Sequence, residues 1–481
     1  MSRILLCLTA LILGLTGCSR PETPPELRWR FLGGRLLQLQ TNAPALRTIL
    51  TLPEAAALAQ PLARQMAQAW WNFGQADGEP PPAALEAGAQ LTQDLIQQLS
   101  IGEVVPASGG REFALAIQVD PARVAVWEKS WPAFISALRT ARGGSAGGPP
   151  AVTRRDVWLL AVSDSTLFPA EATFRRLATY PPVPGALLQF DSAVKGRPGA
   201  QVAFTTTNGN VRLAATVTTV ESVPATLPAW ELPSFIREPL IQFTAARGLK
   251  PLTAGWLELD SLTGSNPINQ LFIWGQPNVT MRFPFMAAQV DQPKALLDHL
   301  YQRFQNSFAP ASPSPLYQGR LLQDTNRLVL LGGLPVAPVL QISEKETKPF
   351  VTFGVIPMIR TTNPPAPEMI QQMNQPNVLV YDFEFTSESV KQWNALLQLP
   401  ELLEGRQGIV NFPGSRWLMT AGPKLGECVT VVTRSGDRTL EVVRKSPVGL
   451  SGLELTALTK WLDPLPPLRR QLTNSPARPK P

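Results

Sequence analysis

Two carboxylates in the segment YDFEF, Asp382 and Glu384, form the catalytic pair that is hardest to exclude. Residues two apart in a strand point to the same face, so both carboxylates would share one surface. Glycoside hydrolysis needs two carboxylates at a set separation, which a sequence does not show. The alternative, which we favour, is a half-buried strand with its aromatic rings inward and both carboxylates in solvent. Asp382 and Glu384 are therefore possible ligand contacts, and no residue is assigned as catalytic.

Two tryptophans, Trp127 and Trp131, lie one helical turn apart in the segment VAVWEKSWPAF. A pair of indole rings at this spacing could form a platform for a ligand such as a sugar. The same spacing is typical of a buried helix face, where aromatic residues contribute large apolar area. We expect the buried position and keep Trp127 and Trp131 as possible ligand contacts.

Nucleophile motifs are present but lack their structural context. Ser145 lies in GGSAG, yet a nucleophile elbow needs a strand before it and a helix after it, and here a helical segment precedes and prolines follow. Ser192 and Lys195 have the Ser-x-x-Lys spacing without its companion motifs. His299 falls on or beside an apolar helix stripe, so we expect a structural histidine rather than a general base.

The cysteine and histidine counts limit metal and cofactor chemistry. The chain has 3 cysteines and 1 histidine. If Cys7 leaves with a leader and Cys18 is modified, one free cysteine remains, which excludes an internal disulfide, a structural zinc site, a His-rich zinc centre and a haem with two histidine ligands. A carboxylate-only calcium site stays open, although no alternating Asp/Asn loop is present. No glycine-rich phosphate loop occurs, so nucleotide binding is not expected. We expect no metal and no cofactor.

The first 18 residues, MSRILLCLTALILGLTGC, have a basic start, a short apolar core and small residues at the end. Leu15, Thr16, Gly17 and Cys18 resemble the lipobox of bacterial lipoproteins. The resemblance implies a diacylglyceryl thioether on Cys18, cleavage after Gly17 and acylation of the new amino terminus. Two or more acyl chains give stable anchoring, whereas one gives marginal binding. A plain secretory leader is the alternative.

The resemblance also suggests a location. Ser19 is not the aspartate that often retains such lipoproteins at the inner membrane, so we expect an outer-membrane protein that faces the periplasm. Residues 18–26 would form a proline-rich tether between the lipid and the folded body. The membrane, reached through the lipid on Cys18, is the one partner that the sequence suggests.

Composition indicates a folded body. Hydrophobic residues make up 44% of 481 residues and charged residues 16%, which is typical of globular proteins, and the length favours two domains. No apolar run after residue 17 is long enough to span a bilayer. The net charge of +7 is spread along the chain without a basic run that contains aromatic residues. Nucleic acid is therefore not an expected partner.

A pattern of a strand followed by a capped helix occurs twice. Asp120 follows an apolar strand and precedes a proline, and Asp291 repeats this arrangement 171 residues later (291 − 120). The same offset relates Asp156, which precedes one apolar strand, to Arg327, which begins another. These matches suggest an internal duplication, and a chance alignment of apolar runs is the alternative.

Hairpins and helices complete the predicted fold. Asn208-Gly209 between two β-branched runs predicts a hairpin. We expect helices over 170–178 and 233–246, and a strand from Arg416. The predicted class is α+β, with antiparallel sheets, helices on one face and two related domains. The boundaries are 1–17 for the signal peptide, 18–26 for the tether, 27–250 and 251–465 for the two domains, and 466–481 for a disordered tail.

Three functions follow from these observations. The first is a lipid-anchored cell-envelope protein with a non-catalytic role in binding or assembly. The second is a carrier or sensor of lipids or other hydrophobic ligands, with a cavity between sheet and helices. The third is an envelope hydrolase that uses Asp382 and Glu384.

Overall fold

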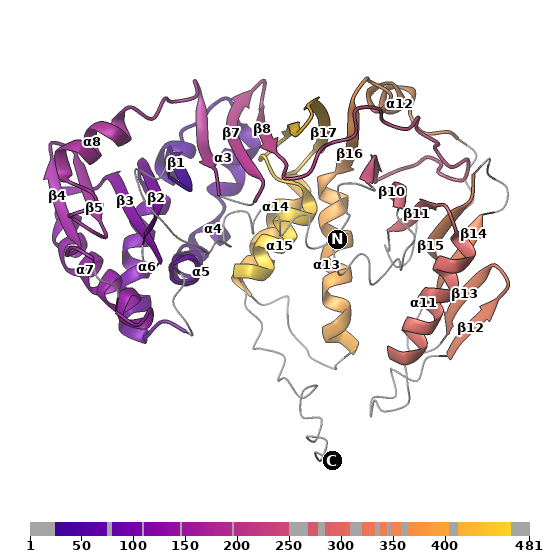
Figure 1. Cartoon of the computed structure of the whole chain (residues 1–481), viewed down its shortest axis with the longest axis horizontal. Coiled ribbons are helices and arrows are strands. Elements are labelled where there is room, and N and C mark those ends of the chain that lie inside the picture. Colours follow the sequence, from indigo (N-terminus) through magenta and orange to yellow (C-terminus); the bar gives the residue numbers. More distant parts are fainter. Residues whose placement is uncertain are drawn as a thin grey trace, which may run out of the picture.

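The computed structural model is organised around one continuous antiparallel sheet of 18 strands (Figure 1). It describes residues 25–74, 79–107, 110–144, 147–194, 197–249, 268–277, 284–307, 320–331, 337–343, 346, 348–356, 363–403 and 412–462. The predicted α+β class with antiparallel pairing is confirmed. The leader, Cys18, Ser145, Lys195 and the predicted tail from 466 lie outside the described residues.

The sheet consists of two half-sheets joined edge to edge. From its outer edge, the first half-sheet runs β4 (Ala151–Arg155), β5 (Trp158–Val162), β3 (Gly110–Gln118), β2 (Ser100–Ala107), β1 (Leu27–Phe31), β6 (Ala186–Ser192), β7 (Gly199–Thr207) and β8 (Asn210–Thr218). The second continues through β18 (Thr439–Ser446), β17 (Glu427–Gly436), β16 (Val378–Phe385), β9 (Gln242–Arg247), β10 (Ile268–Gly275), β11 (Phe285–Val290), β15 (Phe350–Ile356), β14 (Ala337–Ser343), β13 (Arg327–Leu331) and β12 (Arg320–Asp324).

The joint between the half-sheets is the antiparallel pair β8–β18, in which Val211 lies opposite Ser446 and Thr218 opposite Thr439. These strands are more than two hundred residues apart in sequence. The predicted boundary at 250 is not matched by the sheet order, because β9 precedes residue 250 and lies within the second half-sheet. How the chain divides into domains stays a prediction.

Helices lie on both faces of the first half-sheet. On β3, Leu115 packs in a cluster with Trp127, whereas its neighbours Ala114 and Ala116 pack with Leu177 on the other face. The described helices are α2 (Gly34–Leu37), α3 (Pro44–Leu50), α4 (Pro53–Ala57), α5 (Ala59–Phe73), α6 (Pro82–Gln97), α7 (Val124–Ala141), α8 (Ala170–Ala178), α11 (Pro293–Ser307), α12 (Pro367–Met373), α13 (Thr386–Leu403), α14 (Pro413–Ala421) and α15 (Gly452–Leu462). The predicted packing of helices on one face therefore holds for α5, α6 and α7, whereas α8 lies on the opposite face of the first half-sheet.

Parts of the two half-sheets share strand order and register. Adding 171 to the β2–β3 pair Ile101↔Ala116 gives the β10–β11 pair Phe272↔Ala287. Adding 192 to the bulge at Ala186/Leu188 in β6 gives the bulge at Val378/Val380 in β16. The offset that joins Asp120 to Asp291 thus marks equivalent places in both half-sheets. An origin by duplication stays a prediction.

Some local predictions were wrong. The second match at the same offset fails, because β15 rather than β13 pairs with β11 in the place that β5 takes beside β3. Residues 233–246 form no helix: Phe243 and Ala245 lie on β9 and face the core of the second half-sheet. The predicted strand from Arg416 is helix α14. In both segments the apolar spacing fits either state, and tertiary packing decides.

Candidate functional site

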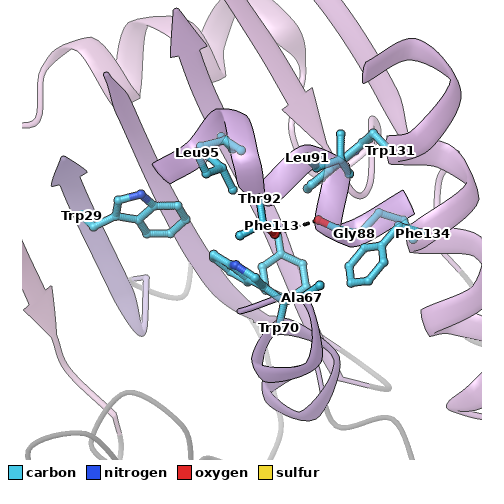
Figure 2. Close-up of a pocket in the computed structure, with 12 residues that line it drawn as sticks. Trp29, Ala67, Trp70, Gly88, Leu91, Thr92, Leu95, Phe113, Trp131 and Phe134 are labelled. Carbon is cyan, nitrogen blue, oxygen red and sulfur yellow. Dashed lines mark hydrogen bonds between the residues drawn. The ribbon is translucent and has the colours of Figure 1, made fainter. Parts of the chain in front are cut away.

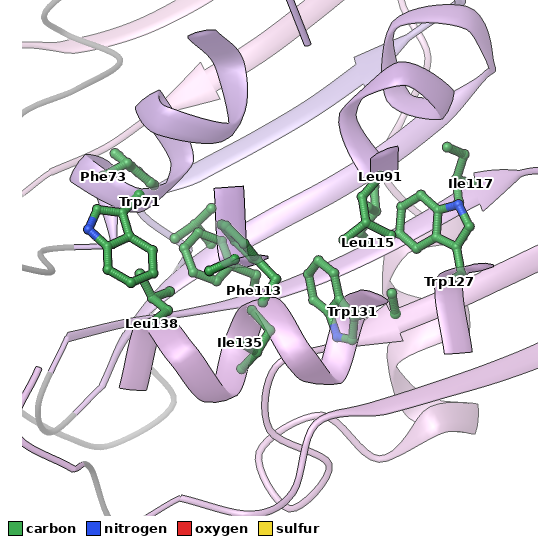
Figure 3. Packing of buried hydrophobic residues seen from close by; sticks show 14 of the residues in the cluster. Trp71, Phe73, Leu91, Phe113, Leu115, Ile117, Trp127, Trp131, Ile135 and Leu138 are labelled. Atoms are coloured by element: carbon green, nitrogen blue, oxygen red, sulfur yellow. The ribbon is translucent and has the colours of Figure 1, made fainter. Parts of the chain in front are cut away.

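Trp127 and Trp131 lie in the core of the first half-sheet, where α7 packs on the strands (Figure 3). Their rings are stacked, with centroids 6.2 Å apart. The Nε1–H of Trp127 donates to Asp94 Oδ2 at 2.8 Å, and that of Trp131 donates to the carbonyl oxygen of Val162 at 2.8 Å. Both indole N–H groups form hydrogen bonds and both rings are buried, which fits the expected position in a buried helix face.

A small aromatic pocket opens beside this core (Figure 2). Trp29 of β1, Trp70 of α5 and Leu95 of α6 lie on one side of it and keep partial contact with solvent. The centroids of the Trp29 and Trp70 rings are 5.5 Å apart. The cavity measures about 30 Å³, and the residues that line it are Trp29, Ala67, Trp70, Gly88, Leu91, Thr92, Leu95, Phe113, Leu115, Trp131, Phe134 and Ile135.

The position of Trp29 depends on a glycine in the neighbouring strand. Gly102 lies directly opposite Trp29 in the β1–β2 pair. A Cβ atom added to Gly102 would lie 2.1 Å from Cζ2 of the Trp29 ring, so the indole rests on bare backbone. Sequence reasoning missed Trp29. The alternation LRWRF predicts a half-buried strand with Trp29 on its apolar face, but nothing local points to Gly102 as its partner.

The chemistry of the aromatic pocket is apolar. The hydroxyl of Thr92, a polar side chain on its wall, already donates to the carbonyl oxygen of Gly88 at 2.7 Å. Water is held in a cavity by polar partners, and the lining of this pocket offers few. The pocket can therefore receive a methyl-sized apolar group, and its three partly exposed residues give access from solvent.

Asp382 and Glu384 lie on one face of β16, as expected, while Tyr381 and Phe383 pack into the core of the second half-sheet on the other face. The expectation of a solvent-exposed pair was wrong for Glu384, whose exposed fraction is 5%. Glu384 is buried because α13 begins directly after β16 and α15 approaches the same face. Nothing near Glu384 in the sequence indicates that the start of α15 lies over this face of the strand.

Each carboxylate is committed to internal hydrogen bonds. Asp382 Oδ1 accepts from Thr244 Oγ1 at 2.6 Å. Glu384 accepts from Ser389 Oγ at 2.6 Å, from Thr386 Oγ1 at 3.2 Å and from the backbone N–H of Gly452. Burial raises the pKa of both groups; with the nearby charge of Asp382, it raises the pKa of Glu384 to about 7.

An ion pair borders these carboxylates. Arg444 of β18 binds Glu454 of α15 and donates to Thr430 Oγ1 at 2.8 Å. Cys428 of β17 is also buried here, and burial raises the pKa of its thiol well above the usual range. A substrate could reach Glu384 only by displacing the helix ends that bind it. The arrangement holds sheet and helices together.

Two further candidate residues, Ser192 and His299, lie on other elements of the described chain. Ser192 is buried in β6, and His299 is half-buried on α11. Within the described ranges, no set of three or more His, Cys, Asp or Glu side chains is placed to hold a metal ion. In the same part of the chain, no helix has both the length and the apolar character needed to cross a membrane.

Comparison with protein-family models, with curated proteins and with solved structures gave no match to this chain.

Proposed function

We propose that this chain is a lipid-anchored protein of the bacterial cell envelope that faces the periplasm and binds an apolar group in the aromatic pocket. The observation that supports binding is the partly open cavity between Trp29 and Trp70, with its apolar lining. The anchor rests on the lipobox-like residues Leu15 to Cys18. The role is binding or assembly rather than catalysis.

The alternatives are weaker on the same geometry. Hydrolysis would need Glu384 to face a substrate, yet its two carboxylate oxygens accept from Thr386, Ser389 and Gly452 beneath two helices. A lipid carrier is favoured by the apolar lining of the pocket. A cavity of about 30 Å³ holds only the tip of an acyl chain, however, so a carrier would require the rings of Trp29 and Trp70 to move apart.

Gly102→Ala is expected to displace the Trp29 ring and deform the aromatic pocket, because the added methyl would lie 2.1 Å from that ring. Overpacking of this kind costs about 1–3 kcal/mol of stability, so the protein should still fold. Native mass spectrometry of the full chain, extracted from its host in mild detergent, should show a bound molecule on the wild type and much less on the variant.

Gly199→Ala is the matched control, because a Cβ on this strand glycine comes no closer than 3.3 Å to its neighbours. It should retain the bound molecule. A lipid adduct would support the carrier, and a protein adduct would support assembly. Equal occupancy of the wild type and Gly102→Ala would refute binding in the pocket.

A further inference from the structure

Glu384 joins three elements at one point. It lies near the end of β16, and its carboxylate accepts from Thr386 and Ser389 in the first turn of α13. It also accepts from the backbone N–H of Gly452, the first residue of α15. The first N–H groups of a helix have no partner within the helix, so Oε1 of Glu384, which accepts from both Thr386 and Gly452, caps α15 while it holds the start of α13. One oxygen can accept both bonds while the other carries a proton, so these contacts are available to the neutral carboxyl group.

The two helices approach each other closely at this point. A Cβ atom on Gly452 would lie 3.0 Å from the Cβ of Ser389, so the start of α15 rests on the first turn of α13. A change in the contacts of Glu384 therefore reaches both helices at once.

The surrounding polar groups are incompletely bonded. Gln392, one turn after Ser389, is 0% exposed, and among the described residues neither its amide nitrogen nor its amide oxygen has a hydrogen-bond partner. The amide nitrogen of Gln242, on the adjacent strand, likewise has none within the described chain. A buried amide without a hydrogen bond is unfavourable. The contact between α13, α15 and the sheet is therefore less stable than a fully hydrogen-bonded network would be.

We propose that Glu384 is a pH-dependent latch, which holds the starts of α13 and α15 on the sheet when its carboxyl group is neutral and releases them when the group ionises. The proposal does not depend on the aromatic pocket. In the released state the carboxylate would be hydrated, and the amides of Gln242 and Gln392 would gain water as a partner.

The direction of the effect follows from linkage. In the closed state burial, and then the charge of Asp382, raise the pKa of Glu384 from 4.5 to about 7, although the hydrogen bonds from Ser389, Gly452 and Thr386 act to lower it. Between pH 4.5 and pH 7, Glu384 therefore keeps its proton in the closed state and has lost it in the open state. Closure is most stable below pH 4.5 and weakens as pH rises through 7. The pKa of Asp382, also raised by burial, acts in the same direction.

The charged and titratable groups near Glu384 come from several elements. They are Asp382 on β16, Cys428 on β17, Arg444 on β18 and Glu454 on α15. Glu388 on the first turn of α13 is paired with Lys391. Arg444 forms an ion pair with Glu454 and a hydrogen bond with Thr430. Its positive charge is therefore largely neutralised by Glu454 and does little to stabilise the ionised form of Glu384.

Hydrogen exchange of the full chain at pH 6 and pH 8 tests the latch, after correction for the intrinsic rate. Opening at the start of α15 should rise by about tenfold between these values in the wild type, from the two pKa values above. Glu384→Gln should remove most of this rise and leave the share that comes from Asp382. Amides of α6 in the first half-sheet should show no such change in either protein.

Two further variants test the latch without replacing Glu384 itself. Ser389→Ala removes a hydrogen bond that favours the ionised form, so the rise should move to higher pH. Asp382→Asn removes the neighbouring charge, so the rise should move to lower pH. A wild type without the rise, an unchanged rise in Glu384→Gln, or a midpoint that neither of these variants moves would overturn the latch.

Discussion

Replacing Cys18 with serine is expected to move the protein from the membrane fraction to the soluble fraction. The sequence resembles a lipobox, so Cys18 would carry a diacylglyceryl group and the new amino terminus a further acyl chain. Each buried methylene contributes about 0.8 kcal/mol, and the loss of all chains removes the anchor altogether. Labelling with a radioactive fatty acid, followed by membrane fractionation, measures both modification and attachment.

The other two cysteines supply the controls. Cys7 lies in the apolar leader, and Cys428 is buried in β17 beneath the helices. Cys7→Ser and Cys428→Ser should both retain label and membrane attachment. Label that persists in Cys18→Ser, or a wild-type protein without label, would contradict the lipid anchor.

Trp127→Ala is expected to lower the free energy of unfolding by about 3–5 kcal/mol, the range for removal of a buried tryptophan. Trp127 is 0% exposed, stacks on Trp131 and donates to Asp94. The substitution removes this packing and leaves a cavity between α7 and the strands. Denaturant unfolding of the full chain in detergent would measure the loss.

Leu39→Ala is the control for this measurement, because Leu39 is 71% exposed and its truncation should change stability by no more than about 0.5 kcal/mol. A small loss for Trp127→Ala together with a change in ligand affinity would instead favour a ligand platform. Because Trp127 is buried in the core, its replacement should lower stability whether or not a ligand is present.

Local signals were sufficient for many elements. Asn208 and Gly209 both have positive φ, 47° and 82°, in the turn between β7 and β8, as an Asn-Gly hairpin requires. The helix predicted over 170–178 matches α8. Asp120 accepts from the backbone N–H of Ala122 at 2.9 Å and caps the short helical turn before α7. In each case a few adjacent residues determine the geometry.

The pairing of strands that are distant in the chain could not be predicted from the sequence. Nothing near Thr218 or Thr439 indicates that β8 and β18 pair and join the half-sheets. The prediction of a helix over 233–246 is wrong, although Ile236, Leu240 and Phe243 do recur at the four- and three-residue spacing of a helix. Packing against the core of the second half-sheet instead selects an extended chain with Phe243 inward.

The candidate site shows the same division. Glu384 could be picked out by its type and its spacing from Asp382, but its burial depends on α15, which begins 68 residues later. The aromatic pocket depends on the contact between Trp29 and Gly102, which are brought together by strand pairing. A single sequence identifies reactive side chains more readily than the surfaces that distant segments create.

Binding at the aromatic pocket is tested most directly by contact quenching of tryptophan fluorescence. The Cys18→Ser protein, free of acyl chains, would be titrated with a short fatty acid that carries bromine at its terminal carbon, below its micelle concentration. The proposal predicts saturable quenching that falls in Trp29→Phe and Trp70→Phe and weakens in affinity in Gly102→Ala. Absent quenching, or quenching of equal strength in Gly102→Ala, would contradict it.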